Sequence, residues 1–245
     1  MSKSRFAFIL FVLTLVPTGF AGLENSSLDS TLDALVKGAP RVTPRALRIA
    51  LTALNRLQAA GVKIRQDRLM VIDYSKPSSE PRFWVFDLDF KRLLFEEPVA
   101  HGKNSGGDRS IRFSNEPGSL MSSLGVFLTA DTYIGKHGLS LRLVGMEKGI
   151  NDRSLERAIV IHGANYVHRS GRIGQSWGCP AVRPEISGAL IESVRGGALL
   201  FSYHPEQYWL QASKLVGARA KGNDAPRSRS IFAALTQPSP AATLP

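Results

Sequence analysis

The chain has 245 residues, 43% of them hydrophobic, and its formal net charge is +11 at pH 7. This length accommodates one domain with additions, and the positive charge points to an anionic partner: a nucleic acid, a membrane surface or an acidic polymer. No nucleic-acid-binding module and no interleaved aromatic and basic motif is present, so the sequence excludes nucleic acid as the expected partner.

The N-terminus has the pattern of a secretory signal. Lys3 and Arg5 give it a basic start, residues 6–16 are almost wholly apolar, and small residues follow where a signal peptidase cuts. The apolar run is shorter than the roughly 20 residues of a membrane span; an uncleaved anchor is the alternative. We predict that residues 1–21 are removed and that the rest, with a net charge of +9, is exported to the periplasm or cell wall without a membrane span. A carboxylate-bearing wall polymer is then the expected partner.

Residues 27–62 predict two packed helices. The first is short, begins near Ser27 and is broken by the Gly-Ala-Pro sequence at residues 38–40. Thr43 and the proline after it predict the start of the second helix, and Gly61 its end. The apolar stripe of the second helix indicates a packing role.

Short strands dominate the next part of the chain, up to about residue 204. Only residues 184–194 predict a helix there. Many short strands between glycine and proline turns predict a mainly β fold, a sandwich or an open barrel. The candidate strands are residues 69–74, 82–88, 92–95, 126–129, 141–144, 158–161 and 199–203.

The C-terminal part predicts an amphipathic helix over residues 206–220 and then a disordered tail rich in proline, serine and alanine. The chain therefore divides into four parts. These are a signal peptide (1–21), an N-terminal helical segment (22–64), a β domain (65–204), and a C-terminal helix with its tail (205–245).

Cys179 is the only cysteine, so the chain has no internal disulfide. It lies between Gly178 and Pro180, a loop setting that favours a reactive thiol over a buried core residue. His162 lies 17 positions earlier, at the end of an apolar run. Because a thiol nucleophile needs a neighbouring base, the spacing predicts Cys179 as nucleophile and His162 as base.

The rest of such a site has weaker signals. No acidic residue of the motif is placed to orient His162, so a backbone carbonyl near Gly163 is the candidate. The turn at Trp177 and Gly178 can aim backbone N–H groups at a carbonyl oxygen. His168 is a rival base in the spacer. A zinc site formed by these histidines and the cysteine lacks the close-paired spacing of common sites, so no metal is expected.

The His-Gly pair, the spacer and the Ser-Trp-Gly-Cys sequence ending at Cys179 resemble the YkuD-type L,D-transpeptidase catalytic domain. The variant with tryptophan resembles the murein L,D-transpeptidase branch of that family. The resemblance covers about residues 66–204. Further stretches that resemble this branch are residues 73–78, 100–106, 113–119 and 133–138.

The resemblance implies a β-sandwich-like catalytic domain and a cysteine-dependent acyl transfer. Cys179 would attack the carbonyl of the third residue of a peptidoglycan stem peptide, usually diaminopimelate, and release D-alanine. An amine on a second stem would resolve the thioester and form a third-to-third crosslink. Water as acceptor would give L,D-carboxypeptidase activity, and a wall-linked lipoprotein is a third acceptor. The resemblance implies no cofactor and no metal, and it implies acylation by carbapenem-type inhibitors.

The resemblance also assigns roles to residues of the motif. His162 would move the protons, the Gly163 carbonyl would hold its imidazole, and the amides of Trp177, Gly178 and Cys179 would form the oxyanion hole. Trp177 stands where most of the family has histidine. The candidates for substrate binding are His101, His137, Ser176 and Arg183, and a plain surface charge is the alternative for Arg183.

Two other classes of protein remain open at this point. One is a different thiol hydrolase of the wall, in which the cysteine normally precedes the histidine, the reverse of the order here. The other is a non-catalytic wall-binding protein, suggested by the positive charge and the missing family histidine.

Overall fold

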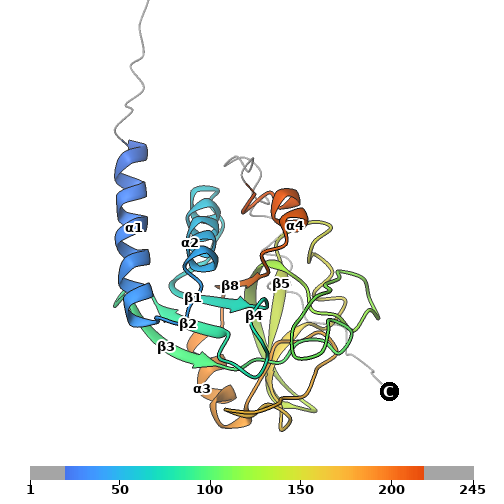
Figure 1. Cartoon of the computed structure of the whole chain (residues 1–245). Helices are drawn as coiled ribbons and strands as arrows, with labels where there is room; N and C mark the ends of the chain where they lie inside the picture. Colours follow the sequence, from blue (N-terminus) through green and yellow to red (C-terminus); the bar gives the residue numbers. More distant parts are fainter. Residues whose placement is uncertain (1–19, 218–245) are drawn as a thin grey trace, which may run out of the picture.

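The structure is a computed structural model that describes residues 20–217. Eight strands form one mixed sheet in the order β3-β2-β1-β8-β4-β5-β6-β7 (Figure 1). The predicted mainly β fold is therefore confirmed. The elements, in chain order, are α1 (Phe20–Gly38), α2 (Pro44–Ala59), β1 (Arg65–Asp73), β2 (Phe83–Asp87), β3 (Arg92–Glu97), β4 (Gly125–Gly135), β5 (Gly138–Gly145), β6 (Val160–Gly163), β7 (Ala181–Val182), α3 (Pro184–Val194), β8 (Ala198–Tyr203) and α4 (Gln207–Ala212).

The sheet mixes parallel and antiparallel pairs. β1 pairs antiparallel with β2 and parallel with β8, and β8 pairs antiparallel with β4. β5 lies antiparallel between β4 and β6, and β6 pairs parallel with β7. In Figure 1 the strands β1 to β3 run across the view while β4 and β5 stand nearly upright, so the sheet is strongly twisted.

The helices cover two sides of this sheet. α1 and α2 stand side by side, and α2 packs on β1 and β8, whereas α3 packs on β5 and β6 (Figure 1). The buried residues Leu47, Leu51, Leu54 and Leu57 recur every three or four positions and place one face of α2 on the core. Burying such leucines contributes roughly 1.5–3 kcal/mol each.

The second predicted helix is confirmed at both ends. It begins after Thr43 and ends before Gly61, whose φ of +72° suits glycine. The Thr43 hydroxyl donates to the Asp73 carboxylate, which ties the start of α2 to the end of β1. The start predicted for the first helix was wrong, because α1 runs through Ser27 from Phe20. The predicted signal lies mostly in residues 1–19, outside the described part.

The predicted C-terminal helix was too long. α4 ends at Ala212, because the next residue, Ser213, is buried in an extended conformation and its hydroxyl donates to the Glu147 carboxylate. The predicted tail beyond residue 217 lies outside the described residues. Within residues 20–217, no helix is long and apolar enough to span a membrane.

Two features near the predicted site were not expected. β7 has only two residues, too few for any periodicity, yet it pairs with the strand that contains His162. β4 and β5 extend into a long hairpin whose turn is Lys136 and His137, where the sequence predicted only short strands. Together they set the positions of the motif residues.

The loop between β5 and β6 is fixed by buried polar groups. The Asn151 amide donates to the carbonyls of Leu124 and Val126 at 2.9 and 3.0 Å, and its oxygen accepts the Glu147 N–H at 2.9 Å. The Glu147 carboxylate accepts the Val126 N–H at 2.9 Å. Burial raises the pKa of Glu147. This network fastens the segment that leads to Ala158.

Asn151→Ala is expected to lower the free energy of unfolding by about 2–3 kcal/mol, because it leaves buried backbone groups without partners. Urea denaturation measures the change. Asn115→Ala is the matched control: Asn115 also makes two hydrogen bonds, to Asp152 and to the Arg153 N–H, but at an exposed site, so its loss should cost under about 1 kcal/mol. Equal costs would contradict this account of the loop.

Candidate active site

The turn that leads to Cys179 is locked by a serine. The Ser176 hydroxyl accepts the Gly178 N–H at 3.1 Å and donates to the Cys179 carbonyl at 2.6 Å. Gly178 has a φ of +126°, and a Cβ there would lie 2.7 Å from the Met121 carbonyl oxygen. Both the backbone angle and the close approach require glycine at this position.

The pairing of β6 with β7 brings Cys179 to the histidine strand. His162 pairs with Ala181, two residues beyond the cysteine. The Cys179 thiol donates to the Ala158 carbonyl at 3.5 Å, and the Val160 N–H hydrogen-bonds the sulfur. Ala158 has a φ of +52°, unusual for a residue other than glycine. The half-buried sulfur therefore lies against the start of the strand that contains His162.

The hydrogen bond of His162 fixes its tautomer. Its Nδ1 lies 2.9 Å from the Gly163 carbonyl oxygen, which only accepts, so the proton of the neutral ring is on Nδ1 and Nε2 holds the free lone pair. Burial lowers the pKa of His162 to about 4; the Gly163 bond opposes this shift, and His137 and Lys136 add to it. At neutral pH the imidazole is uncharged and has a basic nitrogen.

The thiol is also uncharged in this arrangement. Burial raises the pKa of Cys179, and the Val160 N–H and the charges of Arg157 and Lys136 oppose that shift. A thiol has one proton, and here the thiol donates it to the Ala158 carbonyl.

His137 is the predicted substrate-binding residue that the structure brings to this place. It lies in the β4–β5 turn, and its ring stacks on that of His162, with centroids 4.3 Å apart and planes 20° from parallel. Burial and the neighbouring Lys136 lower the pKa of His137. A neutral ring therefore covers one side of the proposed base.

Three other predicted substrate-binding residues have different partners. The Ser176 hydroxyl is used within the turn. The Arg183 guanidinium makes a bidentate ion pair with Glu97, at 2.7 and 3.0 Å, and this pair links the start of α3 to the end of β3. His101 is almost fully buried behind the cysteine turn. The polar atoms of these residues are thus bound within the protein, and their role in substrate binding stays a prediction.

His101 belongs to a buried cluster with Arg82. The Arg82 guanidinium donates to the Val99 carbonyl at 2.7 and 3.1 Å and to the His101 Nδ1 at 2.7 Å. Burial lowers the pKa of Arg82 to about 10 and that of His101 to about 4. The His101 carbonyl accepts the Ser176 N–H at 2.9 Å, so the cluster supports the cysteine turn from behind.

The oxyanion-hole prediction needs one correction. The Gly178 N–H donates to the Ser176 hydroxyl and is not free for a substrate oxygen. In the described part of the chain, the amides of Trp177 and Cys179 have no such acceptor. These two amides are the ones available for a developing negative charge.

Two cations near the thiol were missed in the sequence. Arg157 donates to the Met121 carbonyl at 2.6 Å, and burial lowers its pKa. Lys136 lies in the hairpin turn, and its positive charge lowers the pKa of Cys179 and of both stacked histidines. An arginine just before an apolar strand looks like a surface charge, and only the fold brings it to the sulfur. For Lys136 the sequence had one indication of a place near the site: it lies next to His137 in a short segment with a glycine at each end.

The remaining histidines lie elsewhere. His168 is exposed on the loop after β6, and the His204 ring lies against Phe113 in a tilted contact, with centroids 5.1 Å apart. In residues 20–217 no cluster of three His, Cys, Asp or Glu side chains is placed to hold a metal ion.

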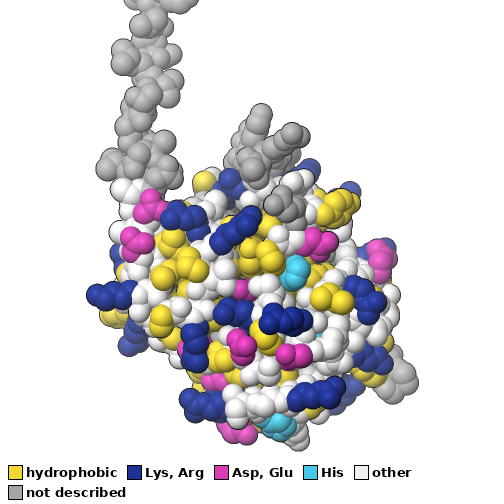
Figure 2. All heavy atoms as spheres, in the orientation of Figure 1, with side chains coloured by type: hydrophobic (Ala, Val, Ile, Leu, Met, Phe, Trp, Pro, Cys, Tyr) yellow, Lys and Arg dark blue, Asp and Glu magenta, His cyan; other side chains and the backbone are white. Residues whose placement is uncertain are grey.

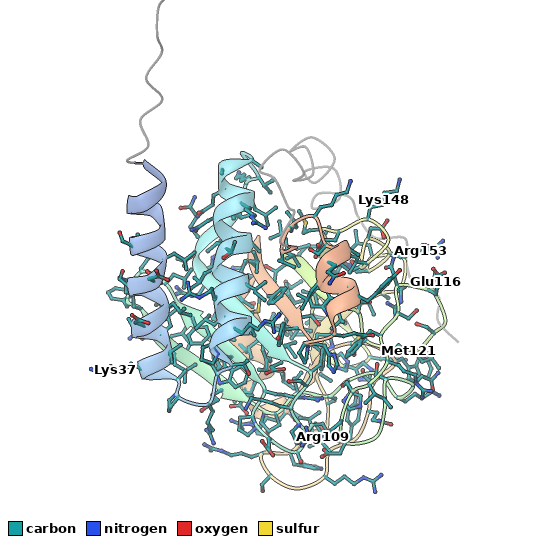
Figure 3. The ribbon with its side chains drawn as sticks, turned by 45° about the horizontal axis from the view of Figure 1, so that its top comes forward. Lys37, Arg109, Glu116, Met121, Lys148 and Arg153 are labelled. Atoms are coloured by element: carbon teal, nitrogen blue, oxygen red, sulfur yellow. The ribbon has the colours of Figure 1, made fainter. Side chains whose placement is uncertain are left out.

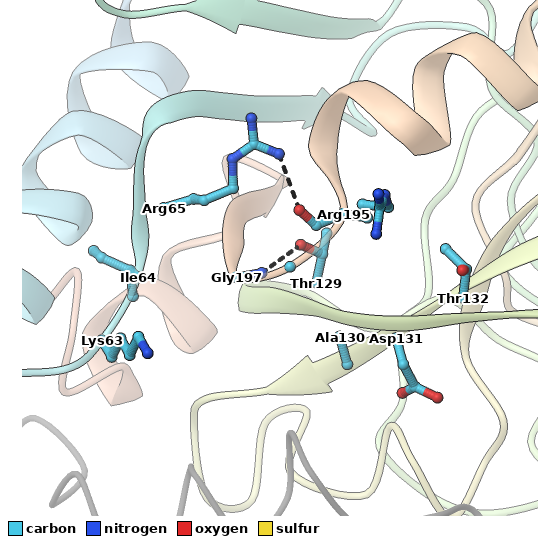
Figure 4. A pocket seen from close by; sticks show the side chains of 10 residues that line it. Lys63, Ile64, Arg65, Thr129, Ala130, Asp131, Thr132, Arg195 and Gly197 are labelled. Atoms are coloured by element: carbon cyan, nitrogen blue, oxygen red, sulfur yellow. Dashed lines mark hydrogen bonds between the residues drawn. The ribbon is translucent and has the colours of Figure 1, made fainter.

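Two hollows lie outside this arrangement. One, of about 400 Å³, is lined by residues of β4, the start of β1 and the α3–β8 turn; there Arg65 donates to the Arg195 carbonyl at 2.9 Å (Figure 4). The other, of about 670 Å³, lies beside α4 and includes Met121 and Lys148 in its wall (Figure 3). Neither is lined by Cys179 or His162.

The model of the L,D-transpeptidase catalytic-domain family matches residues 38–203. The chain belongs to this family, and the matched range begins earlier than the resemblance read from the motifs, so that it includes α2. The comparison with curated proteins found no match.

Solved structures similar to the chain include two enzymes and a cell-shape protein. An L,D-transpeptidase from Mycobacterium smegmatis is 15% identical, with 56% of this chain and 59% of that one covered and a TM-score of 0.37. The helical cell shape determining protein from Campylobacter jejuni is 12% identical, covering 63% and 57%, with a TM-score of 0.39. An L,D-transpeptidase from Mycobacterium tuberculosis is 14% identical, covering 56% and 58%, with a TM-score of 0.35. The match thus spans less than two thirds of each of these relatives.

Gly178→Ala should lower the free energy of unfolding by about 2–4 kcal/mol, because the new Cβ meets the Met121 carbonyl in a strained backbone conformation. It should also change the rate at which Cys179 reacts with a thiol reagent. Gly171→Ala is the matched control, since Gly171 has a φ of +84° with open space around it. Its cost should be only about 1–2 kcal/mol, with an unchanged thiol rate. The same thiol rate in both variants would contradict the packing described for the turn.

Proposed function

We propose that this chain forms third-to-third crosslinks between peptidoglycan stem peptides through a thioester on Cys179. The observation that supports this most is the hydrogen bonding of the only thiol of the chain to Ala158 and Val160, at the start of the strand that contains the neutral His162. Family membership supports an enzyme that acts on the cell wall. The same membership motivates the proposals that carbapenem-type compounds acylate Cys179 and that no cofactor takes part.

The first half-reaction uses the two neutral partners. The His162 Nε2 takes the proton of the Cys179 thiol as the sulfur attacks the carbonyl of the third stem residue. The amides of Trp177 and Cys179 receive the developing oxyanion. The bond to D-alanine then breaks, the leaving amine takes the proton from His162, and the acyl group stays on sulfur as a thioester.

The second half-reaction reverses these roles. An amine of a second stem attacks the thioester carbonyl, and the His162 Nε2 takes a proton from it. The thiolate leaves and regains the proton, which restores the neutral pair. The Gly163 carbonyl keeps the ring in one tautomer throughout, so the same nitrogen serves both steps. Water in place of the amine gives the L,D-carboxypeptidase product.

The positive charge of the chain fits an acidic wall polymer. Lys and Arg side chains are spread over the face shown in Figure 2, and the net charge of the full chain is +11. We propose that the mature chain is exported to the periplasm or cell wall after loss of residues 1–21. We also propose that residues 65–204 form the catalytic unit, with the helical segment 22–64 packed on it and residues 205–245 as a C-terminal addition.

Incubation of the chain with a disaccharide tetrapeptide should give a mass shift on Cys179 equal to the acyl group, and crosslinked dimers as products. Cys179→Ala should show neither. His162→Gln should slow acylation about 10²–10⁴-fold, as expected on removal of a general base. His168→Gln, at an exposed histidine, is the matched control and should keep the parental rate.

Mass spectrometry of the intact protein and of the muropeptides separates the alternatives. Tripeptide without dimer would identify the carboxypeptidase, and cleaved intact sacculi without new crosslinks would identify a different wall hydrolase. Unchanged crosslinking by Cys179→Ala would refute the proposal.

A further inference from the structure

An exposed tryptophan with two lysines lies at the edge of the candidate site. The Trp177 side chain is 58% exposed although it is only two residues before Cys179. The ammonium groups of Lys136 and Lys103 lie 5.1 and 6.0 Å from its ring centroid. The three residues come from the cysteine turn, the β4–β5 turn and the loop after β3. We call them the Trp177 cluster.

Positively charged side chains shift the pKa of the reactive residues. The charge of Lys136 lowers the pKa of Cys179, His162 and His137, and the charge of Arg157 lowers that of Cys179. Positive charges therefore lie near the reactive residues, and Glu116 acts on one of them, Arg157.

The two lysines of the Trp177 cluster have no acidic partner within residues 20–217. Neither Lys103 nor Lys136 takes part in an ion pair between residues of that part of the chain. Both lysines are exposed, and each places its ammonium group in cation–π contact with the same exposed indole. Two positive charges around one ring attract an anion that binds beside it.

We propose that Lys103, Lys136 and Trp177 form a subsite that binds a carboxylate of the stem peptide near the scissile bond. This inference rests on the proposed function and names the substrate group that the site selects. The ammonium groups bind the carboxylate, and the exposed indole face packs on the adjoining aliphatic part of the peptide. The subsite also gives a reason for tryptophan at a position where most of the family has histidine, since the large ring holds both lysines.

Binding of stem peptides to the Cys179→Ala chain tests the subsite without catalysis. The peptides are a tetrapeptide with all its carboxylates and a series in which each carboxylate in turn is a carboxamide. Calorimetry should show that one carboxamide peptide binds about 10-fold more weakly than the parent peptide. In a chain that also contains Lys103→Ala and Lys136→Ala, that peptide and the parent should bind equally. Each lysine alone should account for about 2–5-fold, the range for exposed charge pairs.

Two further variants separate recognition from general effects of charge. Lys37→Ala is the matched control: Lys37 is exposed on α1, far from Met121 beside the cysteine turn (Figure 3), and the variant should keep the full discrimination. Trp177→Phe should keep most of the discrimination because it retains an aromatic face. Trp177→His should lose most of it.

The outcomes distinguish this inference from the proposed function. If the double lysine variant binds every peptide as the parent does, or weakens all of them equally, the subsite is refuted while the crosslinking proposal stands. If the Cys179→Ala chain binds none of the stems, both are refuted. The same two lysine substitutions in a chain that keeps Cys179 show which stem supplies the carboxylate. A rise in KM for the donor stem alone assigns the carboxylate to the donor. A rise for the acceptor alone assigns it to the acceptor, and either supports the subsite.

Discussion

The site depends on the parallel pairing of β6 with the two-residue strand β7. This short ladder sets Ala181 opposite His162 and so places Cys179 at the entry of the histidine strand. The loop that joins the two residues along the chain is long and partly exposed, so the contacts of β6 and β7 set their relative position. A shift of one residue in this register would turn the neighbouring side chains to the other face of the sheet.

Several buried groups hold that pairing in place. Arg82 and His101 lie behind the cysteine turn, and the His101 carbonyl binds the Ser176 N–H. Ser176 then closes the turn over Gly178. Within residues 20–217 the buried guanidinium of this cluster forms no direct ion pair, which is costly unless backbone carbonyls satisfy its N–H groups. We attribute the geometry of the nucleophile to this polar support, since the turn itself has no regular secondary structure.

The same burial sets the protonation states of the proposed pair. Removing the thiol and the imidazole from water disfavours the charged form of each, so the pKa of Cys179 rises and that of His162 falls. The nearby cations oppose the first shift and add to the second. At neutral pH both the thiol and the imidazole are thus uncharged, and in the reaction we propose the charge separates only as the substrate carbonyl is attacked.

The parts of this picture that are local in sequence could be predicted from it. Residues 184–194 form α3 at the predicted bounds, and the strands around residues 69–74 and 199–203 follow their β-branched and aromatic runs. Residue type and spacing also singled out His162 and Cys179, and the structure places the cysteine at the start of the histidine strand; their chemical roles stay a prediction. β7 was not, since two residues have no periodicity.

The misplaced residues share one physical reason: long-range contacts decide their partners. Arg183 was expected near substrate and instead binds Glu97, which lies 86 positions earlier. His101 sits beside glycine as an exposed histidine would, yet Arg82 holds it in the interior. The lysines around Trp177 come from distant loops, and the sequence gives no sign that they meet on one ring.

Titration of the lone cysteine in the resting protein tests the central claim most directly, because its thiolate absorbance has no other source in the chain. The account predicts no thiolate at neutral pH, a thiol that ionises above its ordinary range, and a His162 ring that stays neutral by NMR down to about pH 4. A thiolate paired with a protonated His162 at neutral pH would contradict it.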